Sequence, residues 1–285
     1  MKIALDRYFL NSHIFIAICA AIAYTQSFIL SAGQSPDYSK PIITGLLTFI
    51  FYQAHSVFDR MVQNSNNTTG HNSQLNPILS IFAITVLSIV FFLNFRHFNT
   101  FDYILLFTCA LICASYLLPI PILHKRFRDI WYFKIFLITF CWVAITSIWP
   151  LLSTPPELQV SNFLNFLLVA ERSLLIFTLC LLFDIRDVSI DSQQGTKTIA
   201  LKMGVQNTKR LATILFALFL PIKALVIYFS GIRNYTILGL LVFGVLGVKI
   251  IRSTTLAKPS LFYSGCVDGL ILLDGLFVLF SYCYI

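Results

Sequence analysis

Apolar segments about as long as a bilayer is thick follow one another along almost the whole chain. A transmembrane helix needs about 20 predominantly apolar residues. The sequence offers such segments at 10–31, 41–62, 77–95, 101–120, 130–150, 162–184, 209–230, 234–252 and 261–283. Only 11% of the residues are charged and 58% are hydrophobic, whereas soluble domains average about 25% charged residues. We therefore predict an all-α, polytopic transmembrane bundle of about nine helices, forming a single domain over residues 1–285.

Lysine and arginine are distributed unevenly between the two sides of this predicted bundle. With the N-terminus placed in the cytoplasm, 15 of the 20 basic residues fall in cytoplasmic loops or helix ends, as the positive-inside rule requires. The formal net charge of +8 is then a consequence of topology, and we expect no nucleic-acid partner. We place the chain in the cytoplasmic (inner) membrane, surrounded by lipid, as a multi-pass protein.

Three carboxylates follow the sixth apolar segment. Asp184, Asp187 and Asp191 are spaced by three and four residues, so they share one face of a helix. Mg²⁺ normally binds one or two carboxylates together with the phosphates of a substrate. Because a helix C-terminus is electronegative, acidic residues gathered there are unfavourable unless a cation is present. The segment therefore predicts a site for Mg²⁺ and a phosphate group at one face of the membrane.

A second polar helix end is predicted on the same side of the membrane. The second apolar segment ends near Asp59 and the sixth near Asp184, four crossings later, so both ends are cytoplasmic and can face one cavity. The helical face that contains Asp59 also contains His55, Ser56 and Gln63. We therefore expect Asp59 to supply a fourth carboxylate to the same site.

These residues resemble a known family, the UbiA-type intramembrane prenyltransferases. That family has an Asp-xx-Asp-xxx-Asp run followed by a glycine, a small hydroxyl residue and a further glycine. This chain matches the pattern with Asp184, Asp187, Asp191, Gly195, Thr198 and Gly204. The number of apolar segments extends the resemblance over essentially the whole chain.

The first motif of the family, Asn-Asp-xx-Asp-Arg-xx-Asp, is altered in this chain. Asp59 and Arg60 are kept, whereas His55, Ser56 and Gln63 stand where the family has Asn, Asp and Asp. This departure concerns the half of the site in which the family binds metal through the second helix.

The resemblance implies an enzyme, a prenyltransferase that moves an isoprenyl group from a polyprenyl diphosphate to a lipophilic acceptor, usually an aromatic quinone precursor, with Mg²⁺ as cofactor. It implies that four carboxylates bind the metal and are catalytic: Asp59, Asp184, Asp187 and Asp191. The residues expected to bind the substrate are His55, Arg60, Lys125, Arg126, Arg128, Arg186 and Lys197. Lys125 and Arg126, with Tyr116 before them, correspond at a longer spacing to a tyrosine and a Lys-Arg pair of the family.

Two other functions remain open at this stage. The changes around Asp59 allow a catalytically degenerate relative that binds a lipid diphosphate without transferring it. A secondary transporter is the third hypothesis. Transporters tend to have midplane sites on broken helices, whereas here the polar residues gather at one membrane face and the apolar segments contain few Gly or Pro interruptions.

Ionisable residues inside the apolar segments have two interpretations. Glu171 and Arg172 lie in the sixth segment, and Asp268 and Asp274 lie in the last. Such residues are costly in lipid and face the bundle interior. They either pair with other helices and hold the bundle together or line an internal chamber, and we favour pairing.

Overall fold

The computed structural model describes residues 13–66, 77–94, 98–118, 126–130, 132–158, 161–232 and 236–283, the side chains at 59–80, 83 and 236 excepted. Within these ranges every regular element is a helix. The elements are α2 (Ile14–Ala32), α3 (Ser39–Asn66), α4 (Pro77–Asn94), α5 (Thr100–Leu117), η2 (Phe127–Asp129), α6 (Phe133–Val143), η3 (Ala144–Ile148), α7 (Trp149–Ser153), η4 (Pro156–Leu158), α8 (Asn162–Gln193), α9 (Ile199–Ser230), α10 (Thr236–Ser253), α11 (Ser260–Phe262), η5 (Tyr263–Val267) and α12 (Gly269–Cys283).

Two of these helices are continuous across a π turn. The turn η3 joins α6 to α7, and η5 joins α11 to α12. Counted in this way, the described residues form nine rods, and each of the nine predicted apolar segments corresponds to one of them. The prediction of an all-α bundle of about nine helices is confirmed.

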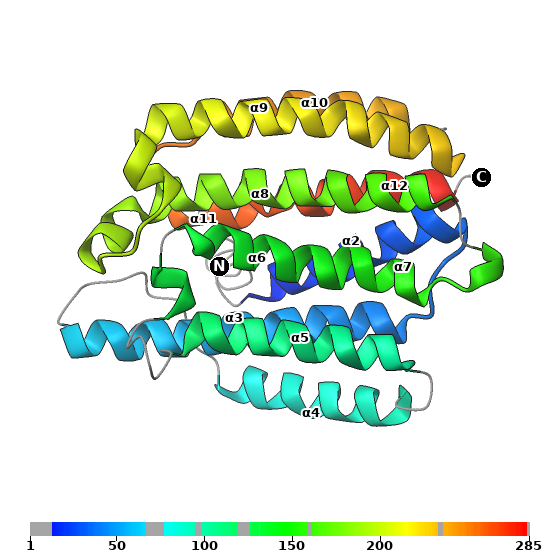
Figure 1. The fold of residues 1–285 in the computed structure, drawn as a ribbon, viewed down its shortest axis with the longest axis horizontal. Coiled ribbons are helices and arrows are strands. Elements are labelled where there is room, and N and C mark those ends of the chain that lie inside the picture. The colour runs from blue at the N-terminus through cyan, green and yellow to red at the C-terminus, as the bar shows by residue number, and fades with distance from the viewer. Residues whose placement is uncertain are drawn as a thin grey trace, which may run out of the picture.

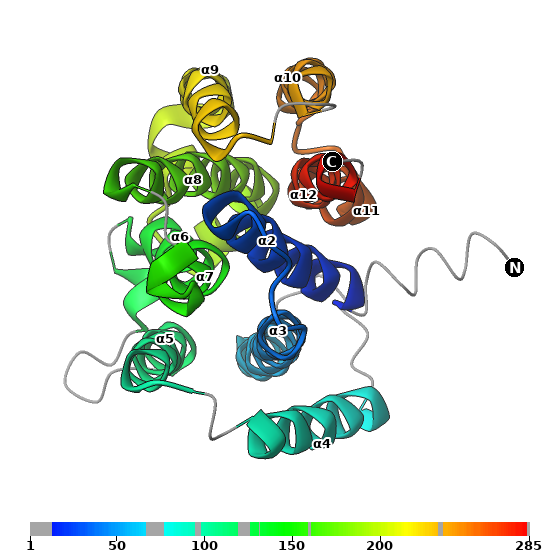
Figure 2. The ribbon, with the colours of Figure 1, turned by 90° about the vertical axis from the view of Figure 1, so that its right-hand side faces the viewer.

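The rods run side by side, and α2 lies in the middle of the bundle (Figures 1 and 2). Helix α2 packs against α3, α7, η3 and α12, while α8 packs along α9 and α6. Helix α4 lies at the periphery against α3, and α10 lies at the opposite edge beside α9. The ends of α3 and α8 and the start of α6 lie at one end of the bundle (Figure 1), as the parity of the predicted crossings requires.

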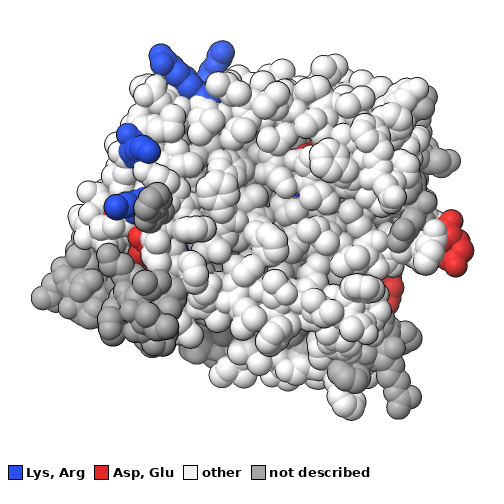
Figure 3. All heavy atoms as spheres, in the orientation of Figure 1, with Lys and Arg blue, Asp and Glu red and all other residues white. Residues whose placement is uncertain are grey.

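Large apolar side chains face outward along the length of the bundle. Phe92 is 81% exposed and Val245 is 70% exposed, so only lipid is left to cover them. Seven of the rods are long and apolar enough to cross a membrane, and the face drawn in Figure 3 shows charged side chains almost only toward its two ends. The chain is a multi-pass integral membrane protein.

Small residues let the central helix approach its neighbours closely, as is common between helices in membranes. A Cβ added at Gly45 of α3 would lie 3.0 Å from the carbonyl oxygen of Ala17 on α2. A Cβ added at Gly275 of α12 would lie 2.4 Å from Cγ2 of Ile22, also on α2. The two glycines therefore set the distance between α2 and the helices on either side of it.

Charged side chains within the bundle form a closed network. Lys223 of α9 contacts Glu171 of α8 at 3.4 Å and Asp274 of α12 at 3.0 Å. Asp274 also accepts a hydrogen bond of 2.8 Å from Gln26 of α2, and Gln26 in turn accepts one from Arg172. Four helices are thus joined by two acids and two bases, all buried. This supports the pairing interpretation for Glu171, Arg172 and Asp274.

Candidate active site

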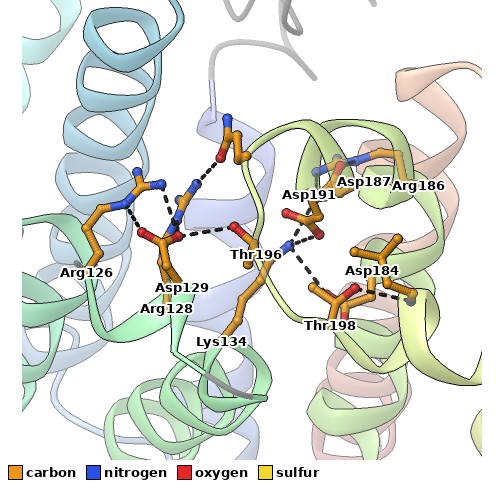
Figure 4. A network of polar contacts seen from close by, with 12 residues as sticks. Arg126, Arg128, Asp129, Lys134, Asp184, Arg186, Asp187, Asp191, Thr196 and Thr198 are labelled. Carbon is orange, nitrogen blue, oxygen red and sulfur yellow. Dashed lines mark hydrogen bonds and ion pairs between the residues drawn. The ribbon is translucent and has the colours of Figure 1, made fainter. Parts of the chain in front are cut away.

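The three predicted carboxylates lie on one face of α8, near its C-terminal end. Helix α8 continues to Gln193, so the spacing of three and four residues brings Asp184, Asp187 and Asp191 together as predicted. The Nζ atom of Lys134, in the first turn of α6, lies 3.4 Å from Asp184, 3.7 Å from Asp187 and 2.8 Å from Asp191 (Figure 4). One ammonium group therefore bridges all three carboxylates.

The charge of this cluster is only partly compensated. Asp184 and Asp191 are 1% and 3% exposed, and Oδ2 of Asp184 has no hydrogen-bond partner among the described residues. Asp187 receives two hydrogen bonds from Arg186, of 2.7 and 3.1 Å. Three negative charges thus face two positive ones, and one buried carboxylate oxygen is free to accept a further ligand.

Arg186 is fixed in place by aromatic rings as well as by Asp187. Its guanidinium carbon lies 4.7 Å from the ring centre of Phe183 and 5.7 Å from that of Tyr263. Each cation–π contact contributes roughly 0.5–2 kcal/mol. The side chain is therefore held beside the carboxylates.

A third basic group approaches the cluster from the segment before α6. Arg128 donates a hydrogen bond of 2.6 Å to Nε2 of His55 on α3 and one of 3.4 Å to Gln194, and it lies over the ring of Tyr116. Arg128 is 5% exposed. It links α3, α5 and the end of α8. The altered first motif on α3 is therefore held close to the acidic motif on α8.

The glycine and threonine residues after the carboxylates shape the turn between α8 and α9 and the first part of α9. Gly195, in the turn, has φ of +68°, and Gly204, at a kink inside α9, has φ of +76°, a left-handed conformation that favours glycine. Between them, Thr198 caps α9 by accepting a hydrogen bond from the backbone of Leu201. The glycine and threonine residues that follow the acidic run therefore have a structural role: they allow the chain to reverse direction so that α9 begins next to the site.

The carboxylates line one end of a cavity of about 1280 Å³, which is larger than most small-molecule pockets, whose volumes are about 300–1,000 Å³. Apolar and aromatic side chains of α3, α4, α5 and α6 form most of its wall. The charged residues that line it are Arg128, Lys134, Asp184, Arg186, Asp187, Asp191 and Asp268. A charged group and a long apolar chain can therefore occupy the same cavity.

The other predicted site residues are placed as follows. His55 lines the cavity, where Arg128 holds it. Arg126 is buried, but it pairs with Asp129 at 2.8 and 3.1 Å and does not line the cavity. Lys197 is exposed in the turn after α8 and lies outside the lining. The side chains of Asp59 and Arg60, and the whole of Lys125, lie outside the described residues.

Lys134 was missed as a site residue in the sequence interpretation. It was counted there only among the basic residues that set the topology, although a lysine just inside the fifth apolar segment is a signal that it has a partner. Its partners are 50 to 57 positions away in the sequence, which the sequence alone does not reveal.

His13 lies at the N-terminal end of α2, where its Nε2 is 2.9 Å from the hydroxyl oxygen of Ser56. Burial, with a smaller contribution from the Arg186 charge, lowers the pKa of His13 to about 4. Below pH 6.5 the unfolded chain takes up a proton at this position that the native protein does not, so stability falls as the pH decreases.

Replacing this histidine is expected to weaken the pH dependence. Protonation of His13 in the unfolded chain lowers the free energy of unfolding of the native protein by about 2 kcal/mol at pH 5. The variant His13→Asn lacks this group and should therefore lose less stability than the native protein between pH 7 and pH 5. Asparagine is chosen because it tolerates the positive φ of this residue. Midpoints of thermal unfolding in detergent at both pH values measure the difference, and an equal loss in both proteins would contradict the assignment.

No protein-family model matches the sequence, and no curated protein matches it. Solved structures do. The chain matches a digeranylgeranylglyceryl phosphate synthase with a TM-score of 0.61 and 14% identity over 100% of both chains. It matches a UbiA homologue from Aeropyrum pernix K1 with a TM-score of 0.63 and 11% identity over 95% of this chain and 97% of that one.

A UbiA homologue from Archaeoglobus fulgidus, solved with GPP and Mg²⁺ bound, matches with a TM-score of 0.62 and 13% identity over 98% of both chains. The chain has the UbiA-type fold. The resemblance drawn from the acidic motif is therefore confirmed at the level of the fold. At these identities the UbiA-type fold is what the matches establish.

Proposed function

We propose that this protein is an intramembrane prenyltransferase that moves an isoprenyl group from a polyprenyl diphosphate to a lipophilic acceptor. The observation that supports it most is the joining of a cluster of carboxylates and fixed cations to a large apolar cavity, within a UbiA-type fold. A diphosphate fits the charged end and a prenyl tail fits the apolar wall. We place the charged end at the cytoplasmic face, where the basic loops gather.

The carboxylate cluster suits Mg²⁺ by its chemistry. Asp184 has a buried oxygen without a hydrogen-bond partner among the described residues, and carboxylates are the protein ligands that Mg²⁺ takes together with substrate phosphates. In the part of the chain that the structure describes, no three acidic, His or Cys side chains are grouped to enclose an ion by themselves. A cation at this cluster would therefore need phosphate oxygens to complete its shell, and it would share the three carboxylates with Lys134. We propose Asp184, Asp187 and Asp191 as its ligands, with Asp59 as a fourth from α3.

Bound Mg²⁺ would neutralise charge on the diphosphate. The protein supplies the remaining stabilisation through groups that are already in place. Lys134 and Arg128 line the cavity, and they donate hydrogen bonds to the diphosphate as its charge grows during cleavage of the allylic C–O bond. Preorganised donors of this kind are usually the largest single contribution to catalysis.

The aromatic wall protects the reacting carbon. The rings of Phe51, Tyr52, Tyr116 and Phe183 line the cavity close to the charged residues, and their faces attract a developing allylic cation. The same rings exclude water, which would otherwise capture the cation and yield only the prenyl alcohol.

A degenerate diphosphate-binding protein is the second candidate function. The interaction of Ser56 with His13 favours it, because Ser56 stands where the family has an aspartate and its hydroxyl does not replace that charge. Such a protein would bind the donor with Mg²⁺ but release no pyrophosphate.

The test of the proposed function is release of pyrophosphate from geranyl diphosphate by the protein in lipid nanodiscs. We expect release to depend on Mg²⁺ and to fall about 100-fold in Asp187→Ala, which removes a ligand and frees Arg186. Asp37→Ala, at an exposed position beyond the far end of α2, is the matched control and should leave the rate unchanged. Thermal stabilisation by donor and Mg²⁺ without turnover would favour the degenerate protein, and the absence of both would refute the proposal.

A further inference from the structure

A polar strip faces the cavity from the last rod of the bundle. Ser260, Ser264 and Asp268 are spaced by four residues and all line the cavity, followed by Ile271. The backbone N–H of Asp268 donates to the carbonyl of Tyr263, which is the bond that closes the π turn η5. Turns of this kind occur frequently at functional sites. The strip therefore places three polar side chains of this rod against the cavity.

Asp268 differs from the other acid on the same rod. Asp274 is bound by Lys223 and Gln26 and belongs to the closed network. The carboxylate of Asp268 makes no hydrogen bond or ion pair with any described residue. Burial acts on this carboxyl group more strongly than any charge does, and Arg186, the cation that acts on it electrostatically, is already bound to Asp187. The pairing interpretation thus holds for Asp274 and not for Asp268.

An acid inside the bundle that has no hydrogen-bond or ion-pair partner among the described residues is expected to have a function. Taking a carboxylate out of water without hydrogen bonds is costly, and an ionisable residue inside a membrane marks a functional site by default. Because Asp268 lines the cavity, a ligand in that cavity can supply the missing hydrogen bond.

The residues that line the cavity differ in chemistry from helix to helix. Those of α3, α4 and α5 are mostly apolar, such as Leu47, Phe91 and Leu106. His13 at the start of α2 and the strip that begins on α11 and η5 add polar groups to the lining. A prenyl tail fits the apolar residues, which leaves the polar strip for the second substrate.

We propose that Asp268 binds the acceptor, a neutral lipophilic hydroxyl compound, and takes its proton during transfer. This inference depends on the proposed prenyl transfer. The allylic C–O bond breaks and its electron pair leaves with the diphosphate. A lone pair of the acceptor's hydroxyl oxygen forms the new bond to the allylic carbon, and the hydroxyl proton passes to the Asp268 carboxylate. An acceptor that itself has a carboxylate is disfavoured, because two like charges would meet in a poorly solvated cavity.

The test compares two naphthols that differ in one carboxylate, with geranyl diphosphate and Mg²⁺ as donor. The native protein is expected to prenylate 1-naphthol at least tenfold more efficiently, by kcat/KM, than 1-hydroxy-2-naphthoate. Asp268→Asn should lose at least tenfold in kcat with 1-naphthol and should no longer discriminate between the two naphthols. Asp37→Asn, an exposed acid, is the matched control and should behave like the native protein.

Donor binding separates this inference from the proposed function. Thermal stabilisation by geranyl diphosphate and Mg²⁺ should be the same in the native protein, Asp268→Asn and Asp37→Asn. If the native protein binds and ionises the donor but uses neither naphthol, prefers the carboxylated one, or loses nothing on Asp268→Asn, the assignment of Asp268 is wrong while prenyl transfer stands. If the native protein does not bind the donor at all, the proposed function fails first.

Discussion

Replacing Lys134 with glutamine is expected to destabilise the protein by about 3–5 kcal/mol when no divalent cation is present. The ammonium group lies within 3.7 Å of all three carboxylates of α8, and two of these carboxylates are almost fully buried. Removing one partner of a buried ion pair leaves charge uncompensated, which costs about that amount. Midpoints of thermal unfolding in detergent, measured with EDTA, give the difference.

Adding Mg²⁺ should restore most of the stability lost in Lys134→Gln. The variant exposes three carboxylates to any cation that can enter the cavity, and a ligand that binds only the folded state stabilises it by mass action. The native protein, in which Lys134 already compensates the charge, should gain less from Mg²⁺ alone. Lys197→Gln is the matched control, since that lysine is exposed, and it should change neither value. A variant as stable as the native protein in EDTA would show that the carboxylates do not need Lys134.

The bundle could be predicted from the sequence because each rod depends on its own composition. A segment of about 20 apolar residues has to form its backbone hydrogen bonds internally in lipid, so nine such segments predict nine helices without knowledge of any neighbour. The acidic face of α8 was predictable for the same reason, since the spacing of Asp184, Asp187 and Asp191 acts within one helix. The predicted end of the sixth segment at 184 was too early, because hydropathy falls where the carboxylates begin, whereas the helix continues to Gln193.

Features that need two helices could not be predicted in this way. Arg128 meets His55 across 73 positions of sequence, and Lys134 meets Asp191 across 57. The sequence shows that each residue is polar in an apolar setting, and therefore that a partner exists, but the choice of partner depends on how the rods pack. Asp268 and Asp274 illustrate this limit, because each is an acid within the last apolar segment. Lys223 on α9 forms an ion pair with Asp274 and none with Asp268.

Replacing Lys223 with methionine is expected to have the largest effect on folding of any substitution outside the site, a loss of about 3–5 kcal/mol. Lys223 is 1% exposed and contacts both Glu171 and Asp274, so the change leaves Asp274 without a cation and Glu171 with Arg172 alone, at 4.0 Å. Methionine keeps the length of the side chain and tests the charge instead of the packing. The midpoint of thermal unfolding in detergent and the yield of folded protein both measure the loss.

A compensating variant distinguishes charge from shape. Lys223→Met combined with Asp274→Asn removes one acid along with one base and leaves Glu171 beside Arg172, at 4.0 Å; neutral replacement of a buried ion pair often costs little. This double variant is therefore expected to recover most of the lost stability. Lys249→Met, at an exposed lysine of α10, is the control for the substitution itself. If the double variant is as unstable as Lys223→Met alone, the network stabilises the bundle through its hydrogen-bond geometry. In that case Gln26, which connects Asp274 to Arg172, becomes the residue that holds α2 among the other helices.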